Sequence, residues 1–504
     1  MKEITVFRKL QFLKNYFKKK QNKSIVLTTI NAKWIHPSLA LRLLKANLGP
    51  LEDNCDIIEF ALRQPLGEKL QPLIAARPLI LGVSVSIWNH AAAVELLAEL
   101  KKAWAALKEK PVVILGGPEI SHLPREAEIF SLADYVIRGE GETAFRTLCE
   151  NILTGKRETR LPPQFIDCAP VKLDEIKSGY RLYTGEDLAK KLIYVEASRG
   201  CPFNCEFCLS AVKDGHGSGG AVREFPLEPF LAEMDALVRC KVKTFKFLDR
   251  TFNLNIKRAL RIMEFFLEKI EEGNVPLVVH FEMVPSLFPD DLREALSRFP
   301  PGTLRLEIGI QTLNPEVAVR IGRPSTPEKE LEALRFLREK TNAVIHADLI
   351  AGLPGEDLAS FGRGFDRLWL ALFETDKIPA GRPSRAEIQL GILKLLPGAP
   401  ISRHSESFGM RYNPLPPYEV LETSAMTSGD LQRIKNFARF WELIINRGLV
   451  KFTGNEPVFE NFFALSNSLL ARFGRNWGIG KDELREAVKS YLCNQEKKAE
   501  FDKD

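Results

Sequence analysis

The chain has 504 residues, of which 45% are hydrophobic and 27% charged, a balance that excludes a disordered, a collagen-like and a disulfide-scaffold protein. At roughly 150 residues per domain, the length predicts about three domains. The net charge of +6 comes from residues 1–23, which hold eight Lys or Arg against one acid and leave −1 for the other 481 residues. The positive charge therefore gives no indication that the folded body binds nucleic acid.

The N-terminal segment, residues 1–23, predicts a basic helix or tail. Phe7, Leu10, Leu13 and Phe17 stand at helical spacing, with lysines on the opposite face. Such a helix docks weakly on the body or is left loose, and a membrane-surface helix is the alternative. No apolar stretch with a small-residue cleavage site follows, so no secretory signal is predicted.

The charge-free stretches are too polar for a membrane span. The longest, 78–94, contains Ser84, Ser86, Asn89 and His90, and it predicts a buried strand that runs into a helix. Eight cysteines are too few for a disulfide framework, and three of them lie within eight residues. We therefore expect a reduced, cytoplasmic protein.

Short β-rich runs alternate with helical segments from residue 24 onward. Strands are predicted at 24–29, 55–60, 79–84, 112–115 and 135–137, with helices between them such as 39–48, 91–107 and 143–153. This alternation predicts a parallel sheet covered on both faces. We expect an α/β, Rossmann-like (flavodoxin-like) domain over residues 24–153, with a ligand at the carboxyl ends of its strands.

Two glycine-rich turns follow the fourth and fifth of these strands. They have the sequences Gly116-Gly117-Pro118-Glu119 and Arg138-Gly139-Glu140-Gly141-Glu142. Glycine at such a turn lets a ligand approach the backbone closely. Each turn is a weak motif by itself, because strand-to-helix turns commonly contain glycine.

A second alternating run begins after a proline-containing connector at 154–190. Its strands are predicted at 191–197, 242–248, 276–282, 303–309, 343–350 and 387–393, and its helices at 227–238, 257–269, 289–298, 329–339 and 358–373. Six strand–helix units predict a partial (β/α)6 barrel over 191–400, whose active site would lie at the carboxyl ends of the strands. A mainly helical region is expected at 401–504.

Three cysteines follow the first barrel strand directly. Cys201, Cys205 and Cys208 have the spacing C-x3-C-x2-C. Three thiolates on one loop can bind three irons of a cubane cluster and leave the fourth iron without a protein ligand. Zinc is the alternative, but His216 and Cys240 give no recognisable zinc spacing.

This loop resembles the signature of the radical S-adenosylmethionine (SAM) enzymes. The resemblance implies a [4Fe-4S] cluster whose open iron is chelated by the amino and carboxylate groups of SAM. It implies reductive cleavage of SAM to methionine and a 5′-deoxyadenosyl radical, with a low-potential electron donor of the flavodoxin or ferredoxin type. By the same resemblance, Phe207 lies against the adenine.

The later strand ends resemble further SAM-binding segments of this superfamily. Asp249 follows the second strand and resembles the residue that holds the amino group in relatives of the methylthiotransferases, although the Gly-Gly-Glu form is absent. In the fourth- and fifth-strand segments, which resemble oxygen-independent coproporphyrinogen dehydrogenase, Gln311 and Asp348 match the ribose contacts and Arg323 the carboxylate contact. The predicted SAM-binding residues are Phe207, Asp249, Glu307, Gln311, Arg323 and Asp348. His280 and Glu282, which end the third strand, are candidates for substrate contact.

Residues 24–150 resemble the cobalamin-binding domain that precedes the barrel in many of these enzymes. The segments 114–121 and 133–142 carry this resemblance. The predicted cobalamin contacts are Ser84, Ser86, Gly116, Gly117, Pro118, Gly139, Glu140 and Gly141. The D-x-H-x-x-G motif is absent, and His36 on the first strand–helix turn is either a cobalt ligand or a loop histidine held by a hydrogen bond.

The resemblance covers about residues 24–400 and extends to a subfamily with a C-terminal domain of unknown function. It implies a cobalamin-dependent methyltransferase acting on an unactivated carbon, with 5′-deoxyadenosine and S-adenosylhomocysteine as products. One alternative keeps the radical chemistry but performs a rearrangement or oxidation, with a vestigial cobalamin site. A second is a non-catalytic iron–sulfur or zinc protein that binds nucleic acid through its basic tail. The sequence assigns neither the substrate nor a catalytic side chain.

Overall fold

The computed structural model describes residues 23–155, 163–212, 220–273, 277–373, 386–450 and 456–501. The chain forms two compact units, of which the first extends to Tyr194 and the second begins at Val195. The predicted helix within residues 1–23 and the residue His216 lie outside the described residues.

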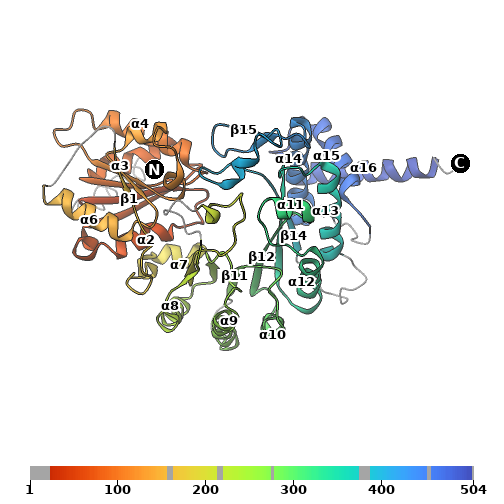
Figure 1. Ribbon diagram of the computed structural model, residues 1–504, viewed down its shortest axis with the longest axis horizontal. Helices are drawn as coiled ribbons and strands as arrows, with labels where there is room; N and C mark the ends of the chain where they lie inside the picture. Colours follow the sequence, from red (N-terminus) through yellow and green to blue (C-terminus); the bar gives the residue numbers. More distant parts are fainter. Residues whose placement is uncertain are drawn as a thin grey trace, which may run out of the picture. The chain divides into compact units, whose positions relative to one another are not determined.

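The first unit is built on a six-stranded parallel sheet with the order β2-β1-β3-β4-β5-β6 (Figure 1). The strands are β1 (Ile25–Asn31), β2 (Cys55–Ala61), β3 (Ile80–Ser84), β4 (Val112–Gly116), β5 (Tyr135–Arg138) and β6 (Gln164–Asp167). The predicted Rossmann-like domain is thereby confirmed. The sequence analysis missed β6, because its residues are half-buried or exposed and lack an apolar run.

Helices cover both faces of this sheet because alternate residues of a strand point to opposite sides. On β1, Val26 packs in a core with residues of α3 and α4, whereas Ile25 and Leu27 pack in a second core with residues of α2 and α6. The helices are α2 (Leu39–Ala46), α3 (Leu66–Ala76), α4 (His90–Ala103), α5 (Pro118–His122) and α6 (Glu142–Leu153), with 3-10 turns η1 (Gly49–Asn54) and η2 (Glu128–Leu132).

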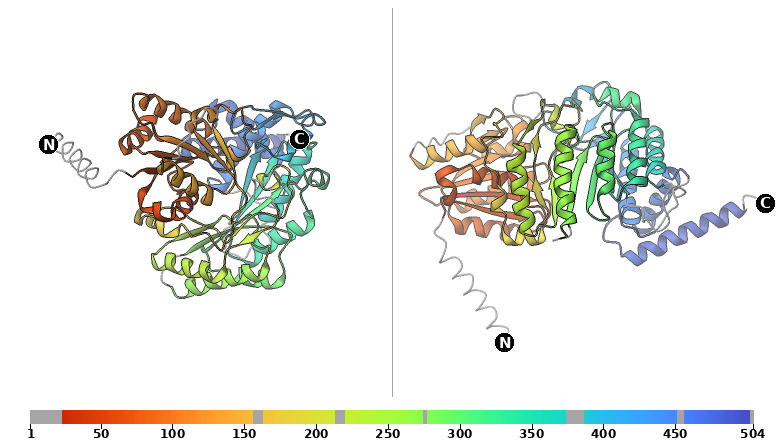
Figure 2. Two further views of the ribbon diagram at one scale, coloured as in Figure 1. Left: turned by 60° about the vertical axis from the view of Figure 1, so that its left-hand side comes forward. Right: turned by 90° about the horizontal axis from the view of Figure 1, so that it is seen from below.

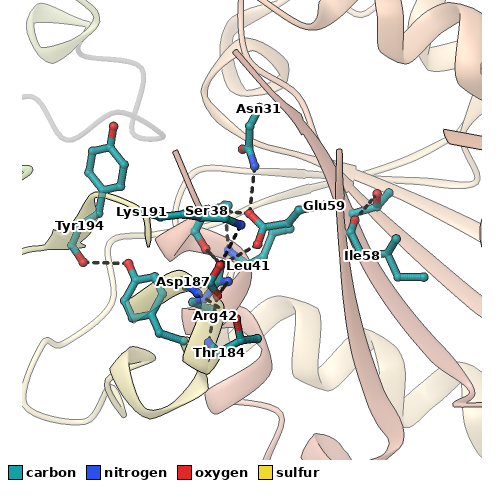
Figure 3. A network of polar contacts seen from close by, with 12 residues as sticks. Asn31, Ser38, Leu41, Arg42, Ile58, Glu59, Thr184, Asp187, Lys191 and Tyr194 are labelled. Carbon is teal, nitrogen blue, oxygen red and sulfur yellow. Dashed lines mark hydrogen bonds and ion pairs between the residues drawn. The ribbon is translucent and has the colours of Figure 1, made fainter. Parts of the chain in front are cut away.

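A buried ionic network attaches the connector to the first unit (Figure 3). The guanidinium of Arg42, which is 3% exposed, lies 2.9 Å from Glu59 and 2.7 Å from Asp187. Lys191 approaches the same Asp187 carboxylate at 2.8 Å. Asp187 belongs to α7 (Gly185–Lys190), which follows the 3-10 turn η3 (Tyr180–Leu182). The segment expected as a connector is therefore an integral part of the first unit.

The second unit contains a six-stranded parallel sheet with the order β14-β13-β12-β11-β10-β7. Neighbours in the sheet follow one another in the chain, as in a partial barrel. The strands are β7 (Ile193–Val195), β10 (Thr244–Phe247), β11 (Val278–Met283), β12 (Leu304–Gln311), β13 (Val344–Ala351) and β14 (Ala386–Ile392). The predicted partial barrel is confirmed, with strand ends shifted by one or two residues.

The helices of the barrel line its outer side, with α8, α9 and α10 in a row (Figure 2). They are α8 (Leu227–Arg239), α9 (Ile256–Glu271), α10 (Asp290–Arg298), α11 (Pro315–Arg320), α12 (Pro327–Lys340) and α13 (Leu358–Phe373). Each strand presents buried apolar residues to these helices. On β11, for example, Val279, Phe281 and Met283 are buried, whereas His280 and Glu282 between them are half-buried. The polar residues consequently gather on the inner face of the barrel.

The C-terminal region packs on the last strand and helix of the barrel. Its elements are η6 (Pro400–His404), β15 (Arg411–Tyr412), β16 (Val420–Glu422), α14 (Ser428–Trp441), the π-turn η7 (Glu442–Asn446), α15 (Phe459–Phe473) and α16 (Lys481–Phe501). Phe365 of α13 meets Trp441 of α14 edge to face at 4.8 Å. The Asn446 amide donates to the Ile388 carbonyl, so the region also covers the edge of β14. Within the described part of the chain, no helix is long and apolar enough to cross a membrane.

Candidate active site

The three-cysteine loop begins where β7 ends. β8 (Ser198–Arg199) pairs with β9 (Arg223–Glu224), and Gly200 then turns the chain with a φ of +106°, which favours glycine. Cys205 is buried, and Cys201 and Cys208 are half-buried. Burial raises the pKa of Cys201 and Cys205, and the neighbouring thiols of the loop raise it further. The structure thus brings the three predicted ligands together on one loop.

Three thiolates on one loop suit a cubane cluster, because each of them binds a different iron. A structural zinc site would instead require four converging ligands.

The loop packs directly against the turn after α11. The Glu206 N–H donates to the Ile321 carbonyl at 2.9 Å. At Gly322, where φ is +65°, a Cβ atom would stand 2.8 Å from the carbonyl oxygen of Asn204. Glycine at 322 therefore allows two backbone segments to approach closely, which restricts the shape of the cysteine loop.

The inner face of the barrel gathers four of the predicted site residues. Glu307 lies 3.5 Å from the Lys246 ammonium and 3.3 Å from the His280 imidazole, and these contacts lower its pKa to about 2. Burial raises the pKa of Glu282 to about 7 and that of Asp348 to about 8, and the charge of Glu307 adds to both shifts. A buried cluster of carboxyls with perturbed pKa values is typical of a functional site.

The sequence analysis missed three polar neighbours on this face besides Lys246. His346 lies 3.1 Å from Glu387 and 3.3 Å from the amide of Gln389. Its ring stacks on that of His280, with centroids 5.8 Å apart. The available signal was the alternation of polar and apolar residues along the predicted strands, which places His346 on the same face as Asp348.

Asp249 is hydrogen-bonded to the segment that leads from β7 into the cysteine loop. Its two carboxylate oxygens accept hydrogen bonds from the Ala197 N–H (2.9 Å) and the Ser198 hydroxyl (2.5 Å). Burial raises its pKa to about 6. Asp249 therefore fastens the exit from β7, and its contact with SAM stays a prediction. Phe207 is half-buried within the loop.

The end of β12 holds Gln311 in an unusual conformation. Its φ is +69°, and the register with β13 shifts between Gly309 and Gln311. A non-glycine residue in this region costs about 1–3 kcal/mol, and such strain is concentrated at functional sites. A Cβ atom at Gly309 would stand 2.6 Å from the Gln311 amide nitrogen, so the small residue makes room for that side chain.

Arg323 connects this strand end with the cysteine loop. Its guanidinium donates to the Gly309 carbonyl and hydrogen-bonds the Cys205 thiol. Its Nε is buried and has no hydrogen-bond partner. A buried donor without a partner is costly, so this position fits an anionic ligand group such as the predicted carboxylate.

The predicted cobalamin residues lie at the carboxyl edge of the first sheet, where β3, β4 and β5 are neighbours. Gly117 has a φ of +108°, and a Cβ atom there would stand 2.5 Å from the Val85 carbonyl oxygen. Gly139 has a φ of +84°. The Glu140 carboxylate accepts from the Val171 N–H at 2.8 Å, so it holds the connector. The edge residues are Ser84, Ser86, Gly116, Gly117, Pro118, Gly139, Glu140 and Gly141.

Exposed apolar side chains lie at the same edge, a feature that the sequence analysis missed. Trp34 and Trp88 are 49% and 51% exposed, and Leu62 is also exposed. They follow β1, β3 and β2, which adjoin one another in the sheet. An apolar surface at the ligand-binding edge fits a large flat cofactor. His36, on the first turn, is hydrogen-bonded to the Tyr194 hydroxyl at 2.8 Å, which matches the second of its two interpretations.

Comparisons with known proteins match both units to known domain families. The model of the B12 binding domain matches residues 25–149, and that of the Radical SAM superfamily matches residues 195–367. The chain is 26% identical over 275 residues to the "Uncharacterized methyltransferase PH0819" of Pyrococcus horikoshii, covering 50% of this chain and 56% of that protein. It is 23% identical over 366 residues to the 2-(S-pantetheinyl)-carbapenam-3-carboxylate methyltransferase of Streptantibioticus cattleyicolor, covering 67% and 50%.

Solved structures share the fold. The radical SAM methyltransferase TsrM from Kitasatospora setae, with tryptophan and a SAM analogue bound, has a TM-score of 0.59 at 18% identity and covers 94% of this chain and 99% of that one. The cobalamin-dependent radical enzyme OxsB, with aqua-cobalamin and SAM bound, has a TM-score of 0.62 at 14% identity, with coverages of 95% and 80%. The chain spans about half the length of the curated relatives it matches.

The two matched domains stand in the order that the sequence predicts. A Radical SAM domain implies a [4Fe-4S] cluster and SAM, and a B12 binding domain implies cobalamin. The chain therefore combines a B12 binding domain with a Radical SAM domain that follows it.

Proposed function

We propose that this protein is a cobalamin-dependent methyltransferase that acts on an unactivated carbon. The observation that carries the proposal is the presence of a B12 binding domain and a Radical SAM domain in one chain, supported by the three-cysteine loop and by the glycine turns with exposed indoles. Its curated relatives include three proteins named as methyltransferases, among them the bacteriochlorophyllide d C-12(1)-methyltransferase of Chlorobaculum tepidum. Their different names leave the substrate of this chain open.

The residues of the barrel have distinct tasks in this proposal. When bound, the cluster and SAM supply the radical chemistry and cobalamin supplies methyl transfer. Cys201, Cys205 and Cys208 would hold three irons. The unpartnered Nε of Arg323 would receive the carboxylate of SAM, because a buried guanidinium suits a carboxylate.

Polar residues of the inner face would bind the rest of SAM and the substrate. Gln311 at the end of β12 and Asp348 within β13 would hold the two ribose hydroxyls. With a pKa of about 8, Asp348 keeps its proton at neutral pH and can donate one hydrogen bond and accept another. His280 and Glu282 are the proposed substrate contacts, and His346 and Glu387 extend the same polar surface.

The first unit would hold cobalamin against its exposed indoles. Gly117 and Gly139 allow the backbone of two turns to approach the cofactor, and Trp34 and Trp88 supply apolar contact area. The small number of cysteines and the clustering of three of them favour a reducing compartment. We therefore also propose a cytoplasmic location and a low-potential reductant of the flavodoxin or ferredoxin type.

The test is an anaerobic product analysis. The protein is reconstituted with iron, sulfide and hydroxocobalamin, reduced with dithionite and given SAM, and both nucleoside products are quantified by mass spectrometry. We expect 5′-deoxyadenosine together with S-adenosylhomocysteine, and neither product from Cys205→Ala. Deoxyadenosine alone would favour the rearrangement or oxidation. If protein that is verified to hold its cluster forms neither of the two products, the proposal is contradicted.

A further inference from the structure

Glu206 lies inside the cysteine motif, yet its side chain is bound by residues that follow the last strand of the barrel. Arg403 donates from Nε at 2.9 Å to one carboxylate oxygen and from its terminal nitrogen to the other. The Nε2 of His404 lies 2.9 Å from the first of these oxygens. These partners stand 197 and 198 residues further along the chain, on η6.

The backbone of Glu206 is bound as well. Its carbonyl accepts from the Ile401 N–H at 3.0 Å, and its own N–H donates to the Ile321 carbonyl at 2.9 Å. η6 therefore binds Glu206 through both its main chain and its side chain, and the turn after α11 binds its main chain. The polar groups of Glu206 are all directed to partners outside the motif.

η6 is itself braced by the barrel. The His404 ring packs edge-on against Phe408, with centroids 5.8 Å apart. The guanidinium of Arg320, at the end of α11, lies 4.8 Å from the centre of the Phe408 ring and donates to the Pro354 carbonyl at 2.6 Å. The segment that carries Arg403 and His404 is thus packed against the end of α11.

We infer that Arg403 and His404 are positioning residues for the iron–sulfur cluster, acting through Glu206. They hold the loop between Cys205 and Cys208 in the shape that binds iron before the metal arrives. This inference rests on the proposed cluster site. It gives a task to the start of the C-terminal region, which had no chemical interpretation from the sequence.

The exposure of Arg403 separates this role from a purely structural one. Its side chain is 64% exposed, whereas that of Glu206 is 10% exposed. An exposed arginine contributes little to overall stability, so removing it should leave thermal unfolding nearly unchanged. Partners of metal ligands, in contrast, typically change metal retention about 10–100-fold when they are lost.

The C-terminal region offers a matched control. Arg411 on β15 makes an ion pair of the same kind with Glu422 at 2.5 Å and is similarly exposed. The test compares Arg403→Ala with Arg411→Ala after anaerobic reconstitution, measuring the rate at which an iron chelator removes the cluster. We expect about tenfold faster loss for Arg403→Ala and a wild-type rate for Arg411→Ala.

A second readout uses the cluster-free protein. Hydrogen exchange of the amides of residues 203–209 should rise in Arg403→Ala and remain unchanged in Arg411→Ala. Glu206→Gln should resemble Arg403→Ala, and combining the two should add little, since both break one contact. Arg403→Lys replaces Arg403→Ala if the latter fails to fold, because it keeps the charge but loses the bidentate fork.

The outcomes separate this inference from the proposed function. If the wild-type protein takes up its cluster and Arg403→Ala has the same rate of cluster loss and the same hydrogen exchange, the positioning role is wrong and the proposed function still stands. Equal losses in both arginine variants would also overturn it. Failure of the wild-type protein to bind a cluster would overturn the inference and the proposed function together.

Discussion

Buried and half-buried charged groups have different roles in the two units. In the first, Arg42 is surrounded by partners, with Glu59 and Asp187 both within 3 Å. On the inner face of the barrel, Glu282 and Asp348 are half-buried with few counter-charges, and their pKa values rise to about 7 and 8. Close ion pairs with two carboxylates hold the first unit together, whereas carboxyls with few counter-charges keep interaction capacity for ligands at a cost in stability.

The largest expected effect comes from breaking the completed network. Arg42→Met leaves Glu59 without its arginine partner and Asp187 with Lys191 alone, and we expect a loss of about 3–5 kcal/mol in the free energy of unfolding. Denaturant unfolding of the cofactor-free protein measures it. Arg146→Met, which removes an exposed pair with Glu150, should cost less than about 0.5 kcal/mol. Equal losses would contradict the distinction between the networks.

The incomplete network should respond in the opposite direction. Asp348 binds its proton more tightly in the folded state, so between pH 4 and its folded pKa of about 8 the chain loses stability as the pH rises. Asp348→Asn should therefore stabilise the cofactor-free protein by about 2–4 kcal/mol at pH 8.5 and by little at pH 4. Unfolding curves of Asp348→Asn and wild type at the two pH values measure this difference in stability. If Asp348→Asn were less stable than wild type at pH 8.5, the contrast between the two units would be wrong.

Glu307, on the neighbouring strand β12, provides a control whose pKa is shifted in the opposite direction. Its contacts with His280 and Lys246 lower its pKa to about 2. Its stabilising contribution is present above pH 4.5 and is lost as the pH falls through about 2. Glu307→Gln should consequently destabilise the protein at pH 7, and the difference from wild type should shrink with acidification.

Backbone fit at the first sheet's edge predicts an intermediate effect. Gly117→Ala places a Cβ atom 2.5 Å from the Val85 carbonyl oxygen at a φ of +108°. We expect a loss of about 2–3 kcal/mol and weaker retention of hydroxocobalamin on a desalting column. Gly67→Ala, in α3 with free space around it, is the control and should be neutral or stabilising by up to about 1 kcal/mol. Similar effects of both changes would show that the turn tolerates a side chain.

The smallest expected effect sharpens the link between strain and ligand binding. Gln311→Gly relieves the positive φ and should stabilise the cofactor-free protein by about 1 kcal/mol. The same change removes a proposed ribose contact, so SAM should bind about tenfold more weakly to the reconstituted protein in equilibrium dialysis. Gln311→Ala should lose the binding without gaining stability. Unaltered SAM binding in both variants would remove Gln311 from the site.

Local patterns predicted the fold because its units repeat a short-range rule. Alternating strands and helices dictate a parallel sheet with its chemistry at one edge, and the structure has that edge in both units. The cysteine spacing is equally local, since all three residues belong to one loop. β6 was missed because a half-exposed edge strand lacks the apolar run by which buried strands are recognised.

The candidate site was predicted less completely than the fold. Glu282, Glu307, Asp348 and His280 meet on the inner face as expected, but His346 and Glu387 join them only through strand register. Asp249 illustrates the opposite difference. Its sequence context predicts a ligand contact, which stays a prediction, and only the structure shows that its carboxylate also accepts hydrogen bonds from Ala197 and Ser198.

The sequence by itself determined the two domain types, the glycine turns and the cysteine loop, because each depends on residues within one turn, strand or loop. Only the tertiary structure decided which distant partners complete them. Asp187 meets Arg42 across 145 residues, and Arg403 meets Glu206 across 197. No periodicity encodes such pairs, since they arise when packing of the apolar faces brings remote segments together and charged groups then find the partners within reach.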